Sequence, residues 1–388
     1  MRLNKLRHAK SKKDFPLFHL KCSLKMAKLK WKSGWPNLRK NLINVKPSKV
    51  KRSSANCANN MDRHNHVVFS LSKTHDLVSR ICQKLKMPMG LITHNEFADG
   101  ETYIRFEESV RNKDVFIFQS TCAPVNDSLM ELLIAIDALK RGSAKSITAI
   151  LPYYGYARQD RKTMGREPIT SKLVADLLTT AGVSRVALTD IHSDQTQGFF
   201  NIPVDTLRTY HVFLTRTVEL LGKKDLVVVS PDYGGVKRAR LIATSLELPL
   251  AIIDKRRPAH NVAESINVLG EVANKNCLIV DDMIDTGGTV IAAAKLLREH
   301  HAKKVCVMAT HGLFNGEAPQ RFQKAFNEGL VDYLFVSNSI PQTKFDQCPQ
   351  FQVIDLTPLF EEVLLCYANN SSISAIYTRH IEWIKKHV

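Results

Sequence analysis

Residues 277–297 read CLIVDDMIDTGGTVIAAAKLL, and this stretch decides the fold. Residues 278–280 end an apolar run, which predicts a buried strand, and apolar residues beyond Gly288 recur at helical spacing. The segment between them is therefore a turn at the carboxyl end of a strand, directly before a helix. In open α/β sheets, ligands bind at such turns.

The turn combines acids with residues that suit an anion: Asp281, Asp282, Asp285, Thr286, Gly287, Gly288 and Thr289. Two glycines let the backbone curl so that successive N–H groups point inward, and the helix start adds partial positive charge. This predicts a phosphate cradle. The acids suit sugar hydroxyls or a hydrated Mg²⁺ instead, so a ribose phosphate satisfies both halves of the turn. The simpler alternative, a helix cap with acids near the helix dipole, leaves several of these residues unexplained.

Strand and helix alternate through most of the chain. The pattern predicts a strand at 114–120, a helix at 126–142 and a strand at 146–154, and it returns at 276–282, 287–300 and 304–312. Such alternation indicates parallel sheets flanked by helices. The repeat predicts an α/β protein with two similar domains, at 61–210 and 211–377, between a leader at 1–60 and a tail at 378–388.

The charge of the chain is uneven. Residues 1–60 hold 17 Lys or Arg and one acid, Asp14, whereas the remaining residues hold 38 basic and 36 acidic side chains. The near-neutral body therefore does not read as a nucleic-acid binder. We expect the leader to be disordered or to precede a true start at Met61, rather than to be a transit peptide. RNA or membrane-surface binding by the leader stays open.

The eight cysteines are scattered and form no C-x-x-C pair, which argues against disulfide frameworks and zinc sites. No apolar run is long enough to span a bilayer. These features predict a cytoplasmic protein without membrane association.

Further motifs occur in a fixed order: FADGE at 97–101, YARQDR at 156–161, LTDIHSDQTQGFF at 188–200, SPDYGG at 230–235 and DKRRP at 254–258. Together with the opening stretch, they closely resemble the ribose-phosphate pyrophosphokinase family, also called phosphoribosyl pyrophosphate synthetases. The resemblance runs from about residue 66 to about residue 377. It implies that the anomeric hydroxyl of ribose 5-phosphate attacks the β-phosphorus of ATP, giving AMP and phosphoribosyl pyrophosphate for nucleotide biosynthesis.

The resemblance also implies roles for individual residues. Lys255 and Arg257 would contact the transferring phosphates, which suits a reaction that needs cations around spreading negative charge. Asp281, Asp282 and the Thr/Gly turn would bind ribose 5-phosphate. The expected ATP-binding residues are Phe97, Asp99, Glu101, Arg158, Gln159 and Asp160, with the first three reaching a neighbouring subunit. His192 and Asp232 would lie at the Mg²⁺ that accompanies ATP, although imidazole is an unusual partner for so hard a cation.

The family implies a homohexamer that phosphate and ADP regulate between subunits. The matching positions are Ser109, Arg111, Ser143, Gln197, Ser372 and Ser374. This chain departs from the family at Thr206, where an Asn is common, and at 372–377, where SISAIY replaces a run like Ser-x-Ser-Tyr-Leu-Phe. Regulation is therefore an open question, whereas the catalytic positions are intact.

Two other functions compete with this reading. A non-catalytic relative that binds an active synthetase would keep the fold but tends to lose catalytic motifs, and this chain keeps them. A nucleobase phosphoribosyltransferase shares the Asp-Asp/Thr-Gly turn but would not explain FADGE, YARQDR and two domains.

Overall fold

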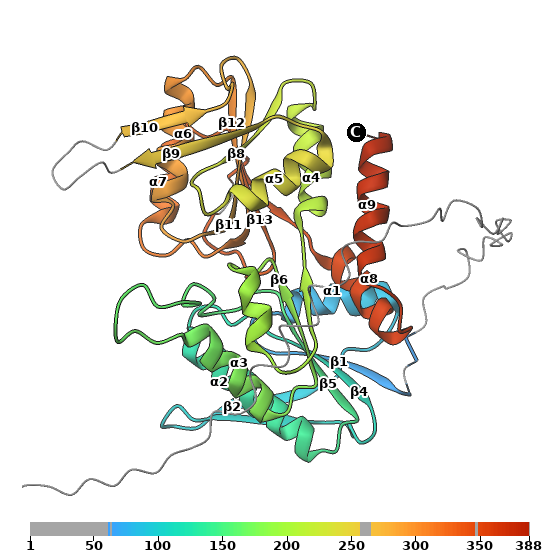
Figure 1. The fold of residues 1–388 in the computed structure, drawn as a ribbon. Coiled ribbons are helices and arrows are strands. Elements are labelled where there is room, and N and C mark those ends of the chain that lie inside the picture. The colour runs from blue at the N-terminus through green and yellow to red at the C-terminus, as the bar shows by residue number, and fades with distance from the viewer. Residues whose placement is uncertain (1–60, 63, 257–264, 346–347, 388) are drawn as a thin grey trace, which may run out of the picture. The chain divides into compact units, whose positions relative to one another are not determined.

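A computed structural model describes residues 61–62, 64–256, 265–345 and 348–387 of the chain. All of them belong to one compact unit, Asn59–Val388. The predicted leader, residues 1–60, lies outside the described residues. Within the unit, the described residues form two large sheets in succession (Figure 1).

The first sheet has the strand order β1-β4-β5-β6-β7, and every pair in it is parallel. Its strands are β1 (His66–Ser70), β4 (Asp114–Phe118), β5 (Ser146–Leu151), β6 (Arg185–Thr189) and β7 (Val204–Leu207). Three helices and a short 3₁₀ helix accompany them: α1 (His75–Leu85), α2 (Val125–Arg141), α3 (Thr170–Ala181) and η1 (Asp194–Phe199). A separate antiparallel hairpin consists of β2 (Ile92–Glu96) and β3 (Thr102–Phe106).

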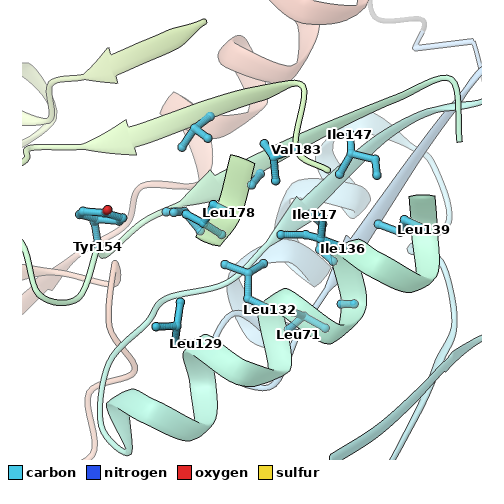
Figure 2. Packing of buried hydrophobic residues seen from close by; sticks show 14 of the residues in the cluster. Leu71, Ile117, Leu129, Leu132, Ile136, Leu139, Ile147, Tyr154, Leu178 and Val183 are labelled. Atoms are coloured by element: carbon cyan, nitrogen blue, oxygen red, sulfur yellow. The ribbon is translucent and has the colours of Figure 1, made fainter. Parts of the chain in front are cut away.

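Alternating strand residues build a core on each face of this sheet. On one face, Ile117 and Ile147 pack against Leu132 and Ile136 of α2 and Leu178 of α3 (Figure 2). Removal of such side chains from water stabilises the fold by about 1.5–3 kcal/mol each. The predicted helix at 126–142 is thus confirmed as α2, which ends before Gly142, although no side chain caps its start.

The second sheet has the strand order β10-β9-β8-β11-β12-β13-β14, and it is parallel except for the β9–β10 pair. Its strands are β8 (Leu226–Ser230), β9 (Leu250–Arg256), β10 (Ser265–Leu269), β11 (Asn276–Ile284), β12 (Lys304–Gly312), β13 (Tyr333–Ser337) and β14 (Phe351–Ile354). Helices cover both faces: α4 (Tyr210–Leu221), α5 (Val236–Leu246), α6 (Gly288–Glu299) and α7 (Ala318–Asn327).

The strand β11, which contains the apolar run at residues 277–280, separates two hydrophobic cores. Cys277 and Ile279 of β11 pack with α6 and α7, whereas Leu278 and Val280 pack with α4 and α5. Because a strand buried on both faces needs apolar residues at every position, the continuous apolar run follows from the topology. Both sheets are mostly parallel and flanked by helices, so the predicted fold class is confirmed.

The last two helices do not stay with one sheet. The helix α8 (Thr357–Ala368) packs with α1 on the second face of the first sheet, and Figure 1 shows these two helices side by side. The helix α9 (Ser374–His387) packs against α4 through Ile384. The predicted tail at 378–388 therefore begins inside a helix. The exact domain limits stay a prediction.

None of the helices in the described part of the chain combines the length and the apolar character that a membrane span requires.

Candidate active site

The turn after β11 has the backbone that an anion site requires. Gly287 has a φ of 76°, in the left-handed region that favours glycine, and a Cβ there would lie 2.7 Å from Cε2 of Phe322. Gly288 faces open space, with Nη1 of Arg321 at 4.0 Å from the position of a Cβ. Within the described residues, no hydrogen bond is recorded for the backbone N–H groups of residues 286–289. Four free donors thus stand at the start of α6.

The acids before this turn contact one histidine and one arginine. Asp282 is buried, and its Oδ2 lies 2.7 Å from Nδ1 of His192. Nη1 of Arg238 lies 3.4 Å from Oδ1 of Asp281 and 3.3 Å from Oδ1 of Asp282. One guanidinium therefore stands between the two carboxylates and reduces their mutual repulsion.

These contacts shift the pKa values of Asp281 and Asp282 in opposite directions. Burial, followed by the neighbouring charge of Asp282, raises the pKa of Asp281. Burial alone would also raise the pKa of Asp282, but the His192 hydrogen bond and Arg238 outweigh it and lower that pKa. The same hydrogen bond raises the pKa of His192 against the opposing effect of burial. The arrangement therefore favours a negative charge on Asp282.

The third acid of the turn connects to a motif of the first domain. Oδ2 of Asp285 lies 2.6 Å from Nη1 of Arg158, and its Oδ1 accepts a hydrogen bond from Nδ2 of Asn315 at 2.8 Å. Burial would raise the pKa of Asp285, but these two hydrogen bonds lower it overall. Arg158, which the sequence predicts to bind ATP, is therefore in contact with Asp285, which the sequence predicts to bind ribose 5-phosphate.

A cavity of about 410 Å³ lies beside these contacts. Its lining contains three residues that the sequence predicts for the site: Arg158, Asp160 and His192. Gln159 is not part of that lining, and its Oε1 accepts a hydrogen bond from the hydroxyl of Thr170. Five Arg or Lys side chains and three Asp side chains line the wall, and this excess of basic groups suits a polar, anionic ligand.

Asp232 follows β8 in the second glycine turn. It is exposed, and its Oδ1 accepts a hydrogen bond from the backbone N–H of Gly235 at 2.9 Å. It stands outside the cavity lining, whereas its neighbour Gly234 belongs to it. In the described ranges, no three His, Cys, Asp or Glu side chains gather into a ready metal site. Mg²⁺ usually takes one or two protein carboxylates together with substrate phosphates, so this donor set fits an ion that arrives with a nucleotide.

The FADGE segment forms the turn of the β2–β3 hairpin and stands apart from the cavity. Phe97 is 57% exposed and lies edge-on to Tyr103, with ring centroids 6.1 Å apart. Oδ1 of Asp99 accepts a hydrogen bond from the N–H of Glu101 at 3.2 Å. Glu101 lines a different cavity, between the hairpin and α2. A single chain therefore does not bring these three residues to Arg158.

The predicted catalytic cations fall at the edge of what the structure describes. The backbone of Lys255 belongs to β9, next to β10, but its side chain lies outside the description. Arg257 lies wholly outside the described residues.

The predicted regulatory positions are dispersed. Ser372 and Ser374 share a hydrogen bond of 2.7 Å and line a cavity of about 670 Å³ together with Lys145. This cavity lies at the amino ends of the parallel strands, where β4 and β5 begin. The other predicted positions do not line it: Ser109, Arg111, Ser143 and Gln197.

Arg238 is the main residue that sequence reasoning missed. It lies in the first turn of α5 and lines the cavity with Lys237, whose ammonium contacts Asp194. The signal was present, because the basic run VKRAR directly follows the glycine turn of SPDYGG. A helix that begins after a glycine turn with basic residues is itself a phosphate-site pattern.

The fold and the turn define a class of protein: the chain is built on the phosphoribosyltransferase plan. Residues 209–325 match the phosphoribosyl transferase domain, and residues 66–182 match the N-terminal domain of ribose phosphate pyrophosphokinase.

Full-length relatives specify the family. The chain is 78% identical over 328 residues to a ribose-phosphate pyrophosphokinase from Mycoplasma genitalium, covering 84% of this chain and 99% of that protein. It is 48% identical to one from Nostoc, covering 81% and 94% respectively. The phosphoribosylpyrophosphate synthetase structure from Mycobacterium smegmatis matches with a TM-score of 0.74 at 45% identity, over 79% of this chain and 100% of that one. The chain belongs to the ribose-phosphate pyrophosphokinase family, and the predicted resemblance is confirmed.

Proposed function

We propose that this chain transfers the β,γ-diphosphoryl group of ATP to the anomeric hydroxyl of ribose 5-phosphate. The anomeric oxygen forms a bond to the β-phosphorus, the bond from that phosphorus to the α,β-bridging oxygen breaks, and the hydroxyl proton is lost. The products are AMP and 5-phosphoribosyl 1-pyrophosphate. High identity to full-length pyrophosphokinases supports this reaction.

One observation carries the proposal at the level of the site. Residues of the ATP motifs and residues of the sugar-phosphate turn are in direct contact, through Arg158 with Asp285 at 2.6 Å and His192 with Asp282 at 2.7 Å. Two substrates that bind these motifs would therefore meet at one place. Such proximity is the main requirement of a phosphoryl transfer.

The sugar phosphate would bind across the turn after β11. The free N–H groups of residues 286–289 and the hydroxyls of Thr286 and Thr289 would hold its 5-phosphate. The carboxylates of Asp281 and Asp282 would accept hydrogen bonds from the ring hydroxyls. Arg238 would keep both acids in place, since it contacts each of them.

The nucleotide would bind through Arg158, Gln159 and Asp160, with Lys255 and Arg257 delivered to the transferring phosphates. Fixed cations around this group stabilise the charge that spreads in the transition state. His192 and Asp232 would hold Mg²⁺ together with ATP oxygens, and this ion would offset phosphate charge. With Nδ1 on Asp282, His192 keeps Nε2 for the ion, a phosphate or a bound water.

The proposal includes assembly into a homohexamer. Apolar side chains are exposed at Ile169, directly before α3, and at Leu173 and Leu177 within α3, and the three follow each other at helical spacing. An exposed apolar helix face of this kind supports contact with a second copy. The exposed Phe97, with Asp99 and Glu101, would then complete the ATP site of a neighbour. Phosphate and ADP would act at the cavity that Ser372 and Ser374 line.

We place the reaction in the cytoplasm. The six cysteines that the structure describes are unpaired, which fits a reducing compartment. The division into domains at residue 210 and the role of the leader belong to the same proposal.

The test is a coupled assay of AMP and phosphoribosyl pyrophosphate from ATP and ribose 5-phosphate, with Mg²⁺ or EDTA and with or without phosphate and ADP. We expect both products only with the metal. Lys255→Ala should lower kcat about 100-fold or more, the range for loss of one transition-state charge contact, while ribose 5-phosphate still binds. The matched control is Lys275→Ala, which removes an exposed ion pair with Asp225.

Three outcomes would contradict parts of the proposal. Absence of AMP from purified protein would favour a non-catalytic relative. Diphosphate release from a free base and phosphoribosyl pyrophosphate would indicate a phosphoribosyltransferase. Near-normal turnover of Lys255→Ala would reject the role of the loop.

A further inference from the structure

We propose that Asp190 is a positioning residue for the reaction, which fixes the turn after β6 so that His192 meets Asp282. The inference rests on the proposed function. Asp190 lies in the motif LTDIHSDQTQGFF but is not among the predicted site residues, yet it lines the cavity two residues before His192.

The carboxylate of Asp190 is held by donors from two parts of the fold. Its Oδ2 accepts hydrogen bonds from the backbone N–H of Thr209 at 3.0 Å, from the hydroxyl of Thr209, and from the hydroxyl of Thr310 at 2.7 Å. Both threonines are buried, and their hydroxyls are 2.9 Å apart. Because a carboxylate only accepts, both hydroxyl protons point to it, and the contact is charge-assisted.

The backbone of the same residue is held as well. Nε2 of the buried His311 lies 3.2 Å from the carbonyl oxygen of Thr189 and 3.3 Å from that of Asp190. Nδ1 of His311 lies 3.0 Å from the hydroxyl of Ser339. Two consecutive residues of β12 thus hold the end of β6: Thr310 contacts the side chain of Asp190, and His311 contacts the backbone.

The two strands that hold this turn are neighbours in the second sheet. Asp281 of β11 is in register with Ala309 of β12, and Met283 is in register with His311. One strand therefore carries Asp282, which reaches His192, and the adjacent strand carries Thr310, which reaches Asp190. The turn is fixed at two points by one rigid frame.

The backbone at Asp190 explains why such fixing is needed. Its φ is 37°, in the left-handed region that non-glycine residues rarely adopt. This conformation redirects the chain after β6, and it persists only where surrounding contacts determine it. Without the carboxylate contacts, the turn would relax, and His192 would no longer stand opposite Asp282.

Kinetics in a double-mutant cycle test the inference. We expect Asp190→Asn and Thr310→Val each to lower kcat about tenfold or more, because a displacement of about 1 Å in a site reduces rates strongly. In a His192→Ala background, Asp190→Asn should lower kcat by less than about twofold, since residues that act through one contact are not additive. Thr310→Val serves as the second variant where Asp190→Asn does not fold.

The matched control is Asp332→Asn, directly before β13 and beside the amino end of β12, far along that strand from Thr310. Asp332 accepts hydrogen bonds from the N–H of Val305 at 2.7 Å and from Arg298 at 2.6 Å, so its loss lowers stability without reaching the site. We expect a lower unfolding temperature with unchanged kcat. A tenfold effect of Asp190→Asn that persists in the His192→Ala background would overturn the inference, and so would an unchanged kcat in both single variants.

A second readout does not depend on turnover. In the ligand-free protein, the proton on Nδ1 of His192 should give a protected downfield NMR signal, assigned by its loss in His192→Ala. Asp190→Asn should remove that signal, whereas Asp332→Asn should keep it. Retention of the signal in Asp190→Asn would contradict the positioning role even in a protein that makes no AMP, so failure of the proposed function is distinguishable.

Discussion

Nδ1 of His192 and Oδ2 of Asp282 are 2.7 Å apart, although 90 residues of sequence separate them. The first residue follows β6 of the first sheet, and the second belongs to β11 of the second sheet. This contact joins a motif predicted for the metal with a motif predicted for the sugar. The hydrogen bond also couples the protonation of the two residues, because it raises the pKa of His192 and lowers that of Asp282.

Asp282→Asn should therefore lower the catalytic efficiency of the enzyme with ribose 5-phosphate. Asn keeps the shape but removes the charge that His192 and Arg238 contact, and hydrogen bonds to charged groups contribute about 1.5–3 kcal/mol. We expect kcat/KM for ribose 5-phosphate to fall about 10- to 100-fold. Steady-state kinetics measure the change, with Asp225→Asn on the surface of the same domain as the control. A change below about twofold would remove Asp282 from the site.

The two glycines of the turn offer a matched pair of variants. Gly287→Ala should lower the free energy of unfolding by about 1–3 kcal/mol, because φ is 76° and the new Cβ would lie 2.7 Å from the Phe322 ring. Gly288→Ala should leave that free energy unchanged or slightly raised, since its Cβ enters open space at a helix start. Denaturant unfolding measures both. Equal effects of the two substitutions would show that the left-handed turn does not limit stability.

Local patterns were sufficient to predict the strand, the turn and the helix around residues 277–297. Apolar residues at successive positions require burial on both faces, and the two glycines mark the turn before the helix. Parallel strands bring their carboxyl ends to one edge of a sheet, and the sequence predicts a ligand-binding turn at that edge after the strand at 276–282. The contact between His192 and Asp282 joins two different sheets, so this rule does not predict it.

Contacts that depend on the order of strands in the sheet could not be predicted from the sequence. Arg238 reaches Asp281 because β8 and β11 are neighbours, while β9 and β10 lie on the other side of β8. Nothing in residues 226–284 specifies that order. The same holds for α8, whose apolar residues indicate burial but not that they pack with α1 of the first sheet.

A buried histidine should make stability depend on pH. His211 is 1% exposed, and neither ring nitrogen has a partner among the described residues; the rings of Tyr210, Tyr377 and His380 surround it. Burial, followed by the charge of His380, lowers the pKa of His211 to about 3. The unfolded chain, with an ordinary pKa near 6.5, therefore binds a proton that the folded chain does not, and stability falls as pH drops below about 6.5.

The size of this effect follows from the linkage of protons to folding. At pH 5.5, His211 should destabilise the fold by about 1.4 kcal/mol relative to pH 8. His211→Leu should remove this part of the pH dependence, so the stability difference between the variant and the wild type should shift in favour of the variant at pH 5.5. Thermal unfolding at both pH values measures it. A difference that does not change with pH would mean that His211 is protonated in the folded protein.

Complementation between inactive subunits would reveal whether the hairpin completes a neighbour's site. Phe97 is exposed on the β2–β3 turn and stands apart from Arg158 within one chain, so Phe97→Ala and Lys255→Ala should damage different halves of a shared site. After subunit exchange in an equal mixture, about a quarter of the sites would hold an intact hairpin and an intact loop, and activity should recover to that extent. The control mixes Lys255→Ala with Asp282→Asn, which lie on the same side of the shared site and should show no recovery. If the Phe97→Ala and Lys255→Ala mixture is no more active than its components, the hairpin does not act across subunits, and Phe97 must serve its own chain or none.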